Sequence, residues 1–357
     1  MIAVDIGNTR AKFGYFPTQS LCSPFPKNES NIKILYNKNN IDNGRKLFEV
    51  ADRELVAEWL YNKQDKTDWY ISVTASCCAV KSFIDELMSI APDVNFNVLT
   101  NADVPIIPNV DFPTRTGIDR LLDAVAAARF VGNNLFNTDS QSQQNDAVAQ
   151  KQSLPSESVV IDSSCFEIPE AEHASAASRS GSSRAKPIAH TGFGIDNPLD
   201  RNRNIETIIV VDAGSAVTVD TVCVNKDLTT FEGGAILPGL RELSVTLNRV
   251  SGKLPEIGLA QFQSVDLIYP AKNTESAILT GILGSLVAAI NFFVQKTQVS
   301  NSGSVDKNLP IIFTGGDAAV IGKLFADEFS DYNLSIVPEL TLIGIAISAV
   351  PCGGFAL

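Results

Sequence analysis

The stretch Asp212-Ala-Gly-Ser-Ala-Val-Thr-Val-Asp220 indicates how this chain folds. It follows the apolar run Ile208–Val211 and precedes the β-rich segment Thr221–Val224. Apolar, β-branched runs on both sides of a glycine turn predict a strand, a tight turn and a second strand. The N-terminus repeats this pattern, with a strand at Met1–Val4 followed by Asp5-Ile-Gly-Asn-Thr9 and a further strand. Two Asp-x-Gly hairpins in one chain predict a duplicated unit.

The residue types in these hairpins suit phosphate binding. Glycine lets the backbone approach a phosphate closely, so that turn N–H groups can point at its oxygens. Asn, Ser and Thr side chains add further donors, and an Asp at a strand end can hold Mg²⁺ directly or through water. Asp-x-Gly is also a common structural turn, so the duplication favours the phosphate interpretation more than either copy alone.

Length and charge narrow the class of protein. The chain has 357 residues, which predicts two lobes rather than one compact core. Its formal charge of −12 and pI of about 4.7 argue against sequence-independent nucleic-acid binding, which needs basic surface. A local positive pocket for a nucleotide remains compatible with this charge.

The cysteines show no CxxC pair, and the adjacent Cys77-Cys78 lies in an apolar run. Free buried thiols are therefore expected rather than disulfides or a zinc site. The first residues already form a strand pattern without a signal-peptide core, so we expect a cytoplasmic protein. The six cysteines are Cys22, Cys77, Cys78, Cys165, Cys223 and Cys352.

Two uncharged C-terminal stretches raise the question of a membrane span. Residues 277–294 just reach the length that permits a span, but they contain Thr280, Ser285 and Asn291. Residues 340–357 are interrupted by Pro351 and the pair Gly353-Gly354. Both stretches are expected to be buried helices at a lobe or subunit interface, with no membrane partner.

The order of predicted elements indicates a mixed α/β lobe at the N-terminus. After the hairpin of residues 1–16 come strands at 31–36, 69–75 and 94–100, with helices at 47–61 and 80–90. Pro113-Thr-Arg-Thr-Gly-Ile-Asp-Arg120 then runs into an Ala-rich helix, which places Gly117 at the helix entrance. A helix N-terminus favours anions. Alternatively, Asp119 is only a first-turn acid and Arg120 a surface charge.

A compositional change marks an insertion. Ser, Gln, Asn and Ala dominate from about 137 to 204, which predicts a mobile segment. Both histidines, His173 and His190, lie in it, so Ser-His-Asp and Cys-His chemistry are not expected. The predicted division is an N-terminal lobe at 1–116, a helix entering the second lobe at 117–136, this insertion, and a C-terminal lobe at 205–357.

The second lobe carries three further motifs. The glycines of Phe231–Gly239 are either turn residues or a place where a ligand comes close. Thr274 either caps the uncharged helix or offers its hydroxyl to a ligand. Thr314-Gly-Gly-Asp317 follows a predicted strand at 309–313 and turns into a helix. Such a Gly-Gly turn can admit the flat face of an adenosine.

Taken together, these motifs resemble the actin, hexokinase and Hsp70 superfamily, and within it the type III pantothenate kinases. The resemblance covers about residues 1–130 and 205–350. It implies two duplicated ribonuclease-H-like α/β lobes, with mixed sheets around a nucleotide cleft. The matching motifs are Asp5–Thr9, Gly117–Arg120, Asp212–Ser215, Gly233–Gly239, Leu254-Pro255, Asn273-Thr274 and Thr314–Gly316.

The resemblance implies transfer of the γ-phosphate of ATP to the terminal hydroxyl of pantothenate in a homodimer. Asp119 would be the general base, and Asp212 would help to bind K⁺ or NH₄⁺, in addition to Mg²⁺ near Asp5. The implied ATP contacts are Asp5, Ile6, Gly7, Asn8, Thr9, Arg10, Ala11, Lys12 and Ser215. The implied pantothenate contacts are Gly117, Ile118, Asp119, Arg120 and Thr274.

The chain departs from the family pattern at two positions. Ser215 stands where the family usually has Thr, which keeps the hydroxyl, and Val110 stands where it often has a Tyr that touches the substrate. The alternatives to the kinase are a non-catalytic regulator that binds nucleotide or pantothenate on the same fold, and a kinase or phosphatase with another substrate. Because the helix dipole favours an anion, Asp119 is expected to stay ionised at neutral pH.

Overall fold

The computed structural model divides the chain into two compact units, residues 1–143 with 204–357, and residues 144–203. All of the second unit, which lies within the predicted insertion at 137–204, falls outside the described residues, so the predicted mobility and domain boundaries stay predictions. The following paragraphs concern the first unit. The described residues are 1–7, 11–16, 35–37, 68–74, 85, 95–138, 206–225, 228–262, 267–302 and 309–349.

The first sheet is built around the N-terminal hairpin. Its strand order is β3-β2-β1-β4-β5. β1 pairs antiparallel with β2, and β2 with β3, whereas β1 pairs parallel with β4, and β4 with β5. The strands are β1 Ile2–Ile6, β2 Ala11–Tyr15, β3 Leu35–Asn37, β4 Trp69–Val73 and β5 Phe96–Val98.

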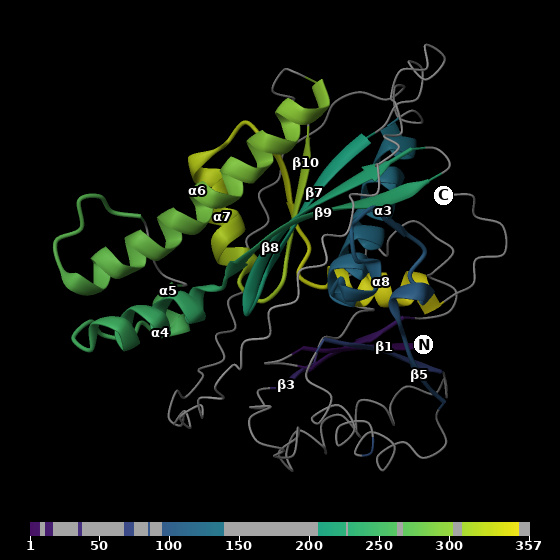
Figure 1. The fold of residues 1–357 in the computed structure, drawn as a ribbon, viewed down its shortest axis with the longest axis horizontal. Helices are drawn as coiled ribbons and strands as arrows, with labels where there is room; N and C mark the ends of the chain where they lie inside the picture. Colours follow the sequence, from purple (N-terminus) through teal and green to yellow (C-terminus); the bar gives the residue numbers. More distant parts are fainter. Residues whose placement is uncertain are drawn as a thin grey trace, which may run out of the picture. The chain divides into compact units, whose positions relative to one another are not determined.

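The second sheet repeats this arrangement (Figure 1). Its order is β11-β10-β7-β8-β9-β6, with antiparallel β7–β8 and β8–β9 pairs and parallel β7–β10 and β10–β11 pairs. Strands β9-β8-β7-β10-β11 therefore match β3-β2-β1-β4-β5 in order and direction, which confirms the predicted duplication. The strands are β6 Ile107–Pro108, β7 Glu206–Ala213, β8 Ala216–Val224, β9 Thr229–Pro238, β10 Pro310–Thr314 and β11 Asn333–Ile336.

The two hairpin aspartates occupy equivalent positions. Asp5 is the next-to-last residue of β1, and Asp212 is the next-to-last residue of β7. Asp5 lies beside Lys12 on β2 and Ser72 on β4. Asp212 lies in the same way beside Thr218 on β8 and Thr314 on β10. The duplication thus extends from the strand order to the position of the acidic side chain.

The helices agree with the sequence pattern where they are described. The Ala-rich helix begins at Ile118, so Gly117 precedes its first residue as predicted. The helices are α3 Ile118–Thr138, α4 Leu240–Ser251, α5 Leu259–Phe262, α6 Thr274–Ser302, α7 Ala318–Glu328 and α8 Leu340–Ala349. Short 3₁₀ turns lie at Asn101–Asp103 and Pro113–Arg115. The helix predicted at 47–61 lies outside the described residues.

The structure excludes one alternative for the glycines and shortens one predicted strand. Gly233 and Gly234 lie inside β9 rather than in a turn, and Gly234 faces Asp220 on the neighbouring strand. The strand predicted to reach Thr100 ends at Val98. Thr100 instead caps the first 3₁₀ turn, because the Asp103 carboxylate accepts hydrogen bonds from its backbone N–H and hydroxyl, both at 2.7 Å. A side chain that satisfies a turn competes with strand pairing for the same backbone groups.

Helices α3 and α8 pack together and join the two sheets in one core (Figure 1). Buried residues of this core come from β1, β7, α3 and α8. At the crossing, Gly344 of α8 lies against the backbone of Leu122, where a Cβ atom would collide with it. The site described below depends on this crossing, because α3 carries Asp119 and β1 carries Asp5.

The predicted uncharged helices are both present. Eight of the ten residues of α8 are buried. Helix α6 is long and apolar enough over Thr274–Gln298 to cross a membrane by composition, but 44% of that window is buried inside the protein. A core helix of a soluble protein passes the same test, so this is weak support for a span. α6 packs against α4 and α7 and contributes to a second core with β7 and β10.

Candidate active site

Asp119 lies in the first turn of α3, directly after the Gly117 entrance. Its Oδ1 accepts a hydrogen bond from the backbone N–H of Arg120 at 2.9 Å. Burial raises the pKa of Asp119, and the negative charge of Asp5 raises it further. The helix start favours the anion, as the sequence predicts. Desolvation and neighbouring carboxylates act in the opposite direction and outweigh it.

Asp5 is almost fully enclosed at 7% exposure. Its Oδ2 lies 3.7 Å from the Lys12 ammonium, whereas Oδ1 has no hydrogen-bond partner among the residues that the structure describes. The hydroxyl of Ser72, beside it on β4, is also buried and has no partner in this described part of the chain. Burial raises the pKa of Asp5, and Lys12 opposes that rise. Because buried polar atoms normally find partners, these unpaired oxygens suit a ligand or cation.

Asp212 and Asp123 form the second acidic pair. Burial raises the pKa of Asp212 to about 7, with Lys12 lowering it and Asp119 raising it. Burial raises the pKa of Asp123 well above its ordinary range, and Asp212 adds to this rise. Asp123 is 1% exposed, and the Thr341 side chain of α8 opposes the rise in its pKa. Two carboxylates this close disfavour each other's charged form unless a cation lies between them.

Sequence reasoning missed Asp123. It lies four residues after Asp119 on α3, and residues at that spacing share one face of a helix. The sequence did contain a signal for it, an acidic residue within the apolar, Ala-rich run 121–128, whose other members are buried. Unpaired acidic residues are rarely buried, so one in such a run indicates a special role.

Arg120 is held by a second residue that the prediction did not include. Its Nε donates to both carboxylate oxygens of Asp220, at 3.2 Å and 3.1 Å, and its Nη2 donates to Oδ1. The guanidinium carbon lies 5.2 Å from the centroid of the Phe231 ring. Asp220 also accepts a hydrogen bond from the Thr218 hydroxyl at 2.9 Å. Arg120 is therefore not simply a surface charge.

The structure brings several predicted residues into one electrostatic neighbourhood. The charges of Asp5 and Asp220 raise the pKa of Asp119. The charges of Asp119, Asp5 and Asp220 raise the pKa of Asp212, whereas Lys12 lowers it. Asn8, Thr9 and Arg10 lie outside the described residues. The side chains of Ile6 and Ile118 are buried in the protein, and Ser215 is exposed in the turn between β7 and β8. Gly7 and Ala11 flank the undescribed part of the first hairpin.

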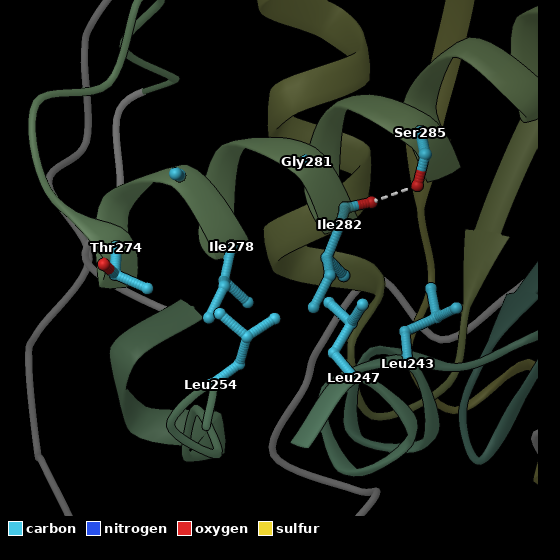
Figure 2. Close-up of a pocket in the computed structure, with 9 residues that line it drawn as sticks. Leu243, Leu247, Leu254, Thr274, Ile278, Gly281, Ile282 and Ser285 are labelled. Carbon is cyan, nitrogen blue, oxygen red and sulfur yellow. Dashed lines mark hydrogen bonds between the residues drawn. The ribbon is translucent and has the colours of Figure 1, made fainter. Parts of the chain in front are cut away.

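Thr274 lies elsewhere. It is the first residue of α6 and lines an apolar groove of about 490 Å³ between α4 and α6 (Figure 2). None of the groove-lining residues belongs to the carboxylate cluster. Asn273, not Thr274, caps the helix, because its Oδ1 accepts the N–H of Ser276 at 2.8 Å. The groove is lined by Leu243, Leu247, Leu254, Thr274, Ala277, Ile278, Gly281, Ile282 and Ser285.

Asp212 also constrains the turn that follows β10. Gly315 has a φ of +92°, which side chains on L-residues rarely permit. A Cβ atom at this position would also collide with the Asp212 carboxylate and the Ala213 backbone. Within the described residues, the first glycine of this pair is thus required by Asp212. The adenosine contact predicted for the Gly-Gly turn stays a prediction.

The acidic residues could supply some of the ligands of a cation, but not a complete set among the described residues. Among the residues that the structure describes, no group of three or more His, Cys, Asp or Glu side chains could hold a metal ion alone. The Asp5 oxygen that has no partner among the described residues, and the raised pKa values of Asp123 and Asp212, nevertheless fit a site whose coordination is completed by other oxygens. Phosphate oxygens and water are ligands of that kind.

Fold and site together define a duplicated α/β protein in which two related hairpins direct acidic residues toward a helix N-terminus. The family model of type III pantothenate kinases matches residues 1–139 and 200–296 of this chain. The chain belongs to the type III pantothenate kinase family. Residues 140–199, in the predicted insertion, lie outside the match.

Individual relatives match a smaller part. A type III pantothenate kinase of Thermosipho melanesiensis is 33% identical over 128 residues, which is 36% of this chain and 47% of the relative. One of Wolinella succinogenes is 33% identical over 147 residues, which is 41% of this chain and 60% of the relative. The matches thus span about half to three-fifths of these relatives. A Campylobacter jejuni structure described as a putative Baf family transcriptional activator covers 98% of this chain and 96% of its own, at 15% identity, but its TM-score of 0.43 supports no conclusion.

Proposed function

We propose that this protein transfers the γ-phosphate of ATP to the terminal hydroxyl of pantothenate, giving 4'-phosphopantothenate in the first step of coenzyme A biosynthesis. The observation that carries the proposal is the position of Asp119, which interacts electrostatically with both hairpin aspartates, Asp5 and Asp212. An acid that accepts a proton thus shares one neighbourhood with two turns suited to phosphate. Membership of the family supplies the substrate.

The two hairpins would bind the triphosphate. Asp5 to Lys12 would contact its phosphates, with the Lys12 ammonium as a counter-charge, and Ser215 would contact ATP from the second hairpin. Phosphoryl transfer depends mainly on positioning and on neutralising charge at the phosphates. Asp119 would accept the hydroxyl proton as that oxygen attacks the γ-phosphorus and ADP leaves. The raised pKa of Asp119 makes it a stronger base than an ordinary carboxylate.

The acidic cluster would need cations for this step. Asp5 would lie near Mg²⁺, and Asp212 would help to hold K⁺ or NH₄⁺, with Asp123 close enough to share that role. These cations would neutralise charge on the phosphates and on the buried carboxylates. The bound cations would also weaken the repulsion among the negative charges of Asp5, Asp119 and Asp212.

We propose that the protein acts as a homodimer. Thr274, a predicted pantothenate contact, lines the α4–α6 groove and not the carboxylate cluster. A second copy seated on this groove would bring Thr274 to its neighbour's site. The two helices that form the groove also carry exposed apolar side chains, Leu247 and Val250 on α4 and Phe292 on α6. Exposed apolar side chains that gather on one surface are typical of a protein interface. The reaction would take place in the cytoplasm, without nucleic-acid or membrane partners.

The test is a coupled assay of ATP consumption with purified protein and pantothenate. Product would be identified by mass spectrometry as the phosphate ester of pantothenate, and K⁺ would be compared with Na⁺. Pantothenate-dependent ADP release that K⁺ stimulates would support the proposal. Folded protein that binds ATP without phosphorylating pantothenate would favour the non-catalytic regulator. Turnover of a different alcohol in a substrate panel would favour another kinase of the same superfamily.

A further inference from the structure

We propose that Asp220 is a positioning residue, which holds the Arg120 guanidinium in the orientation needed to bind an oxygen acceptor of the alcohol substrate beside Asp119. This inference rests on the proposed function. Asp220 lies on β8 of the second sheet, whereas Arg120 follows Asp119 in the first turn of α3. Their pairing fixes the start of the helix that carries the base to the sheet that carries Asp212.

The contact restrains the guanidinium through several atoms at once. Nε and Nη2 of Arg120 both donate to the Asp220 carboxylate. Such multiple hydrogen bonding sets the plane and direction of the group, in addition to its position. The Phe231 ring supports one face of the guanidinium. Three contacts from the second sheet therefore determine where the remaining guanidinium edge points.

Asp220 is itself held in place. It is 2% exposed, and the Thr218 hydroxyl donates to its Oδ2 at 2.9 Å. Thr218 is the residue paired with Asp212 across the β7–β8 hairpin. The hairpin that is predicted to bind a cation and ATP thus also fixes the partner of Arg120.

The pair is not sealed from the site. The Arg120 side chain is 14% exposed, against 3% for Asp220. Nη1 of Arg120 makes no hydrogen bond to any residue that the structure describes. A buried ion pair gives little net stability compared with apolar side chains of similar volume, so stability alone does not explain it. An N–H edge left over beside Asp119 suits an oxygen acceptor on the substrate.

The test compares steady-state kinetics of Asp220→Asn and Thr218→Val with the wild type. Asp220→Asn should raise the KM for pantothenate roughly 10- to 100-fold, the loss expected when charge-assisted hydrogen bonds are disrupted. Thr218→Val removes one hydroxyl and keeps the shape, so it should raise this KM by less, in the same direction. The KM for ATP should change less than about twofold in both, since Arg120 is not assigned to the nucleotide. Asp327→Asn, on an exposed position of α7, is the matched control and should change neither constant.

A double-mutant cycle distinguishes positioning from a general structural role. Arg120→Lys keeps the charge but lacks the planar fork, so it should raise the KM for pantothenate by itself. Adding Asp220→Asn to Arg120→Lys should then cause little further loss, because the two residues act through one contact. Fully additive effects, or equal increases in the KM for ATP and pantothenate, would overturn the inference. So would an unchanged KM for pantothenate in Thr218→Val and a folded Asp220→Asn.

The experiments distinguish failure of the proposed function from failure of the role given to Asp220. A folded wild type that does not phosphorylate pantothenate would reject the function and, with it, the role given to Asp220. An active wild type whose Asp220 variants show no selective loss for pantothenate would reject only the role of Asp220.

Discussion

Opposing influences act on the pKa of Asp119, the proposed base. The helix N-terminus favours its charged form, whereas burial and the charge of Asp5 raise its pKa. A proton acceptor gains driving force as its pKa rises, provided that it stays ionised at the working pH. In the proposed reaction the neighbouring carboxylates would therefore do more than bind cations, because their charge also raises the pKa of the proposed base.

Replacing Asp119 with Asn tests this role. The amide keeps the shape and cannot accept the hydroxyl proton as a base, so kcat should fall by about 10²- to 10⁴-fold. The KM for ATP should change by less than about threefold, since binding of the phosphates is assigned to other residues. Steady-state kinetics with both substrates varied would measure this split. An unchanged kcat would remove Asp119 from the role.

Asp212 predicts an unusual dependence of stability on pH. Its pKa is about 7 in the fold against 3.8 in the reference state, so the ligand-free fold binds more protons than the unfolded chain between these values. The free energy of unfolding should therefore fall as the pH rises from about 4 to 7. Asp212→Asn should flatten this dependence and raise the melting temperature at pH 8 by a few °C, roughly.

Thermal unfolding at pH 5, 6, 7 and 8 without nucleotide would measure this effect, with Asp327→Asn as the control. K⁺ and ATP with Mg²⁺ should raise the wild-type melting temperature most at pH 8, where the carboxylates are charged. A melting temperature of Asp212→Asn that is lower than the wild type at pH 8 would contradict the account.

Individual residues could be predicted from sequence when they belong to a motif. Asp5 and Asp212 lie near the ends of strands and Asp119 opens a helix, and the structure places them in one electrostatic neighbourhood. Asp220 was missed because its importance depends on a contact across the fold, whereas Asp123 had a local signal, an acid within the Ala-rich helix. Asp220 was part of the opening motif, but nothing local indicates that it meets an arginine 100 positions earlier.

At the scale of elements, the hairpins are the most predictable part of the molecule. Alternating apolar runs and an Asp-x-Gly turn determine each hairpin locally. The position of Gly233 and Gly234 inside β9 could not be predicted in this way, because glycine usually indicates a turn. The close approach of β8, with Asp220 beside Gly234, explains why that position is small, whereas Gly233 adopts a φ of +84° that favours glycine.

The α3–α8 crossing gives a prediction about packing. Gly344→Ala should destabilise the protein by about 1–3 kcal/mol, because the added methyl group meets the backbone of Leu122. The matched control is Gly284→Ala on α6, where an added Cβ meets no atom within 4 Å. That change should be neutral or stabilising by about 0.4–1 kcal/mol. Chemical denaturation of both variants would measure the difference, and equal effects would show that the crossing is looser than described.

At the scale of the whole molecule, the dimer proposal predicts that two defective variants can complement each other. If Thr274 acts in the partner's site, a mixture of Asp119→Asn and Thr274→Val subunits forms one intact site in each heterodimer. Random exchange of equal amounts should then restore roughly a quarter of wild-type activity. Leu247→Glu, in the apolar groove, should yield monomers in sedimentation experiments and lose this activity. No recovery on mixing, despite confirmed subunit exchange, would place Thr274 outside the shared site.

The central claim concerns one reaction, and one measurement tests it most directly. Purified protein would be incubated with ATP, Mg²⁺, K⁺ and pantothenate, and phosphorylated pantothenate would be quantified by mass spectrometry beside Asp119→Asn. The account predicts ATP-dependent product from the wild type and at least about 100-fold less from the variant. Absence of product from folded wild-type protein, or equal product from both, would contradict it.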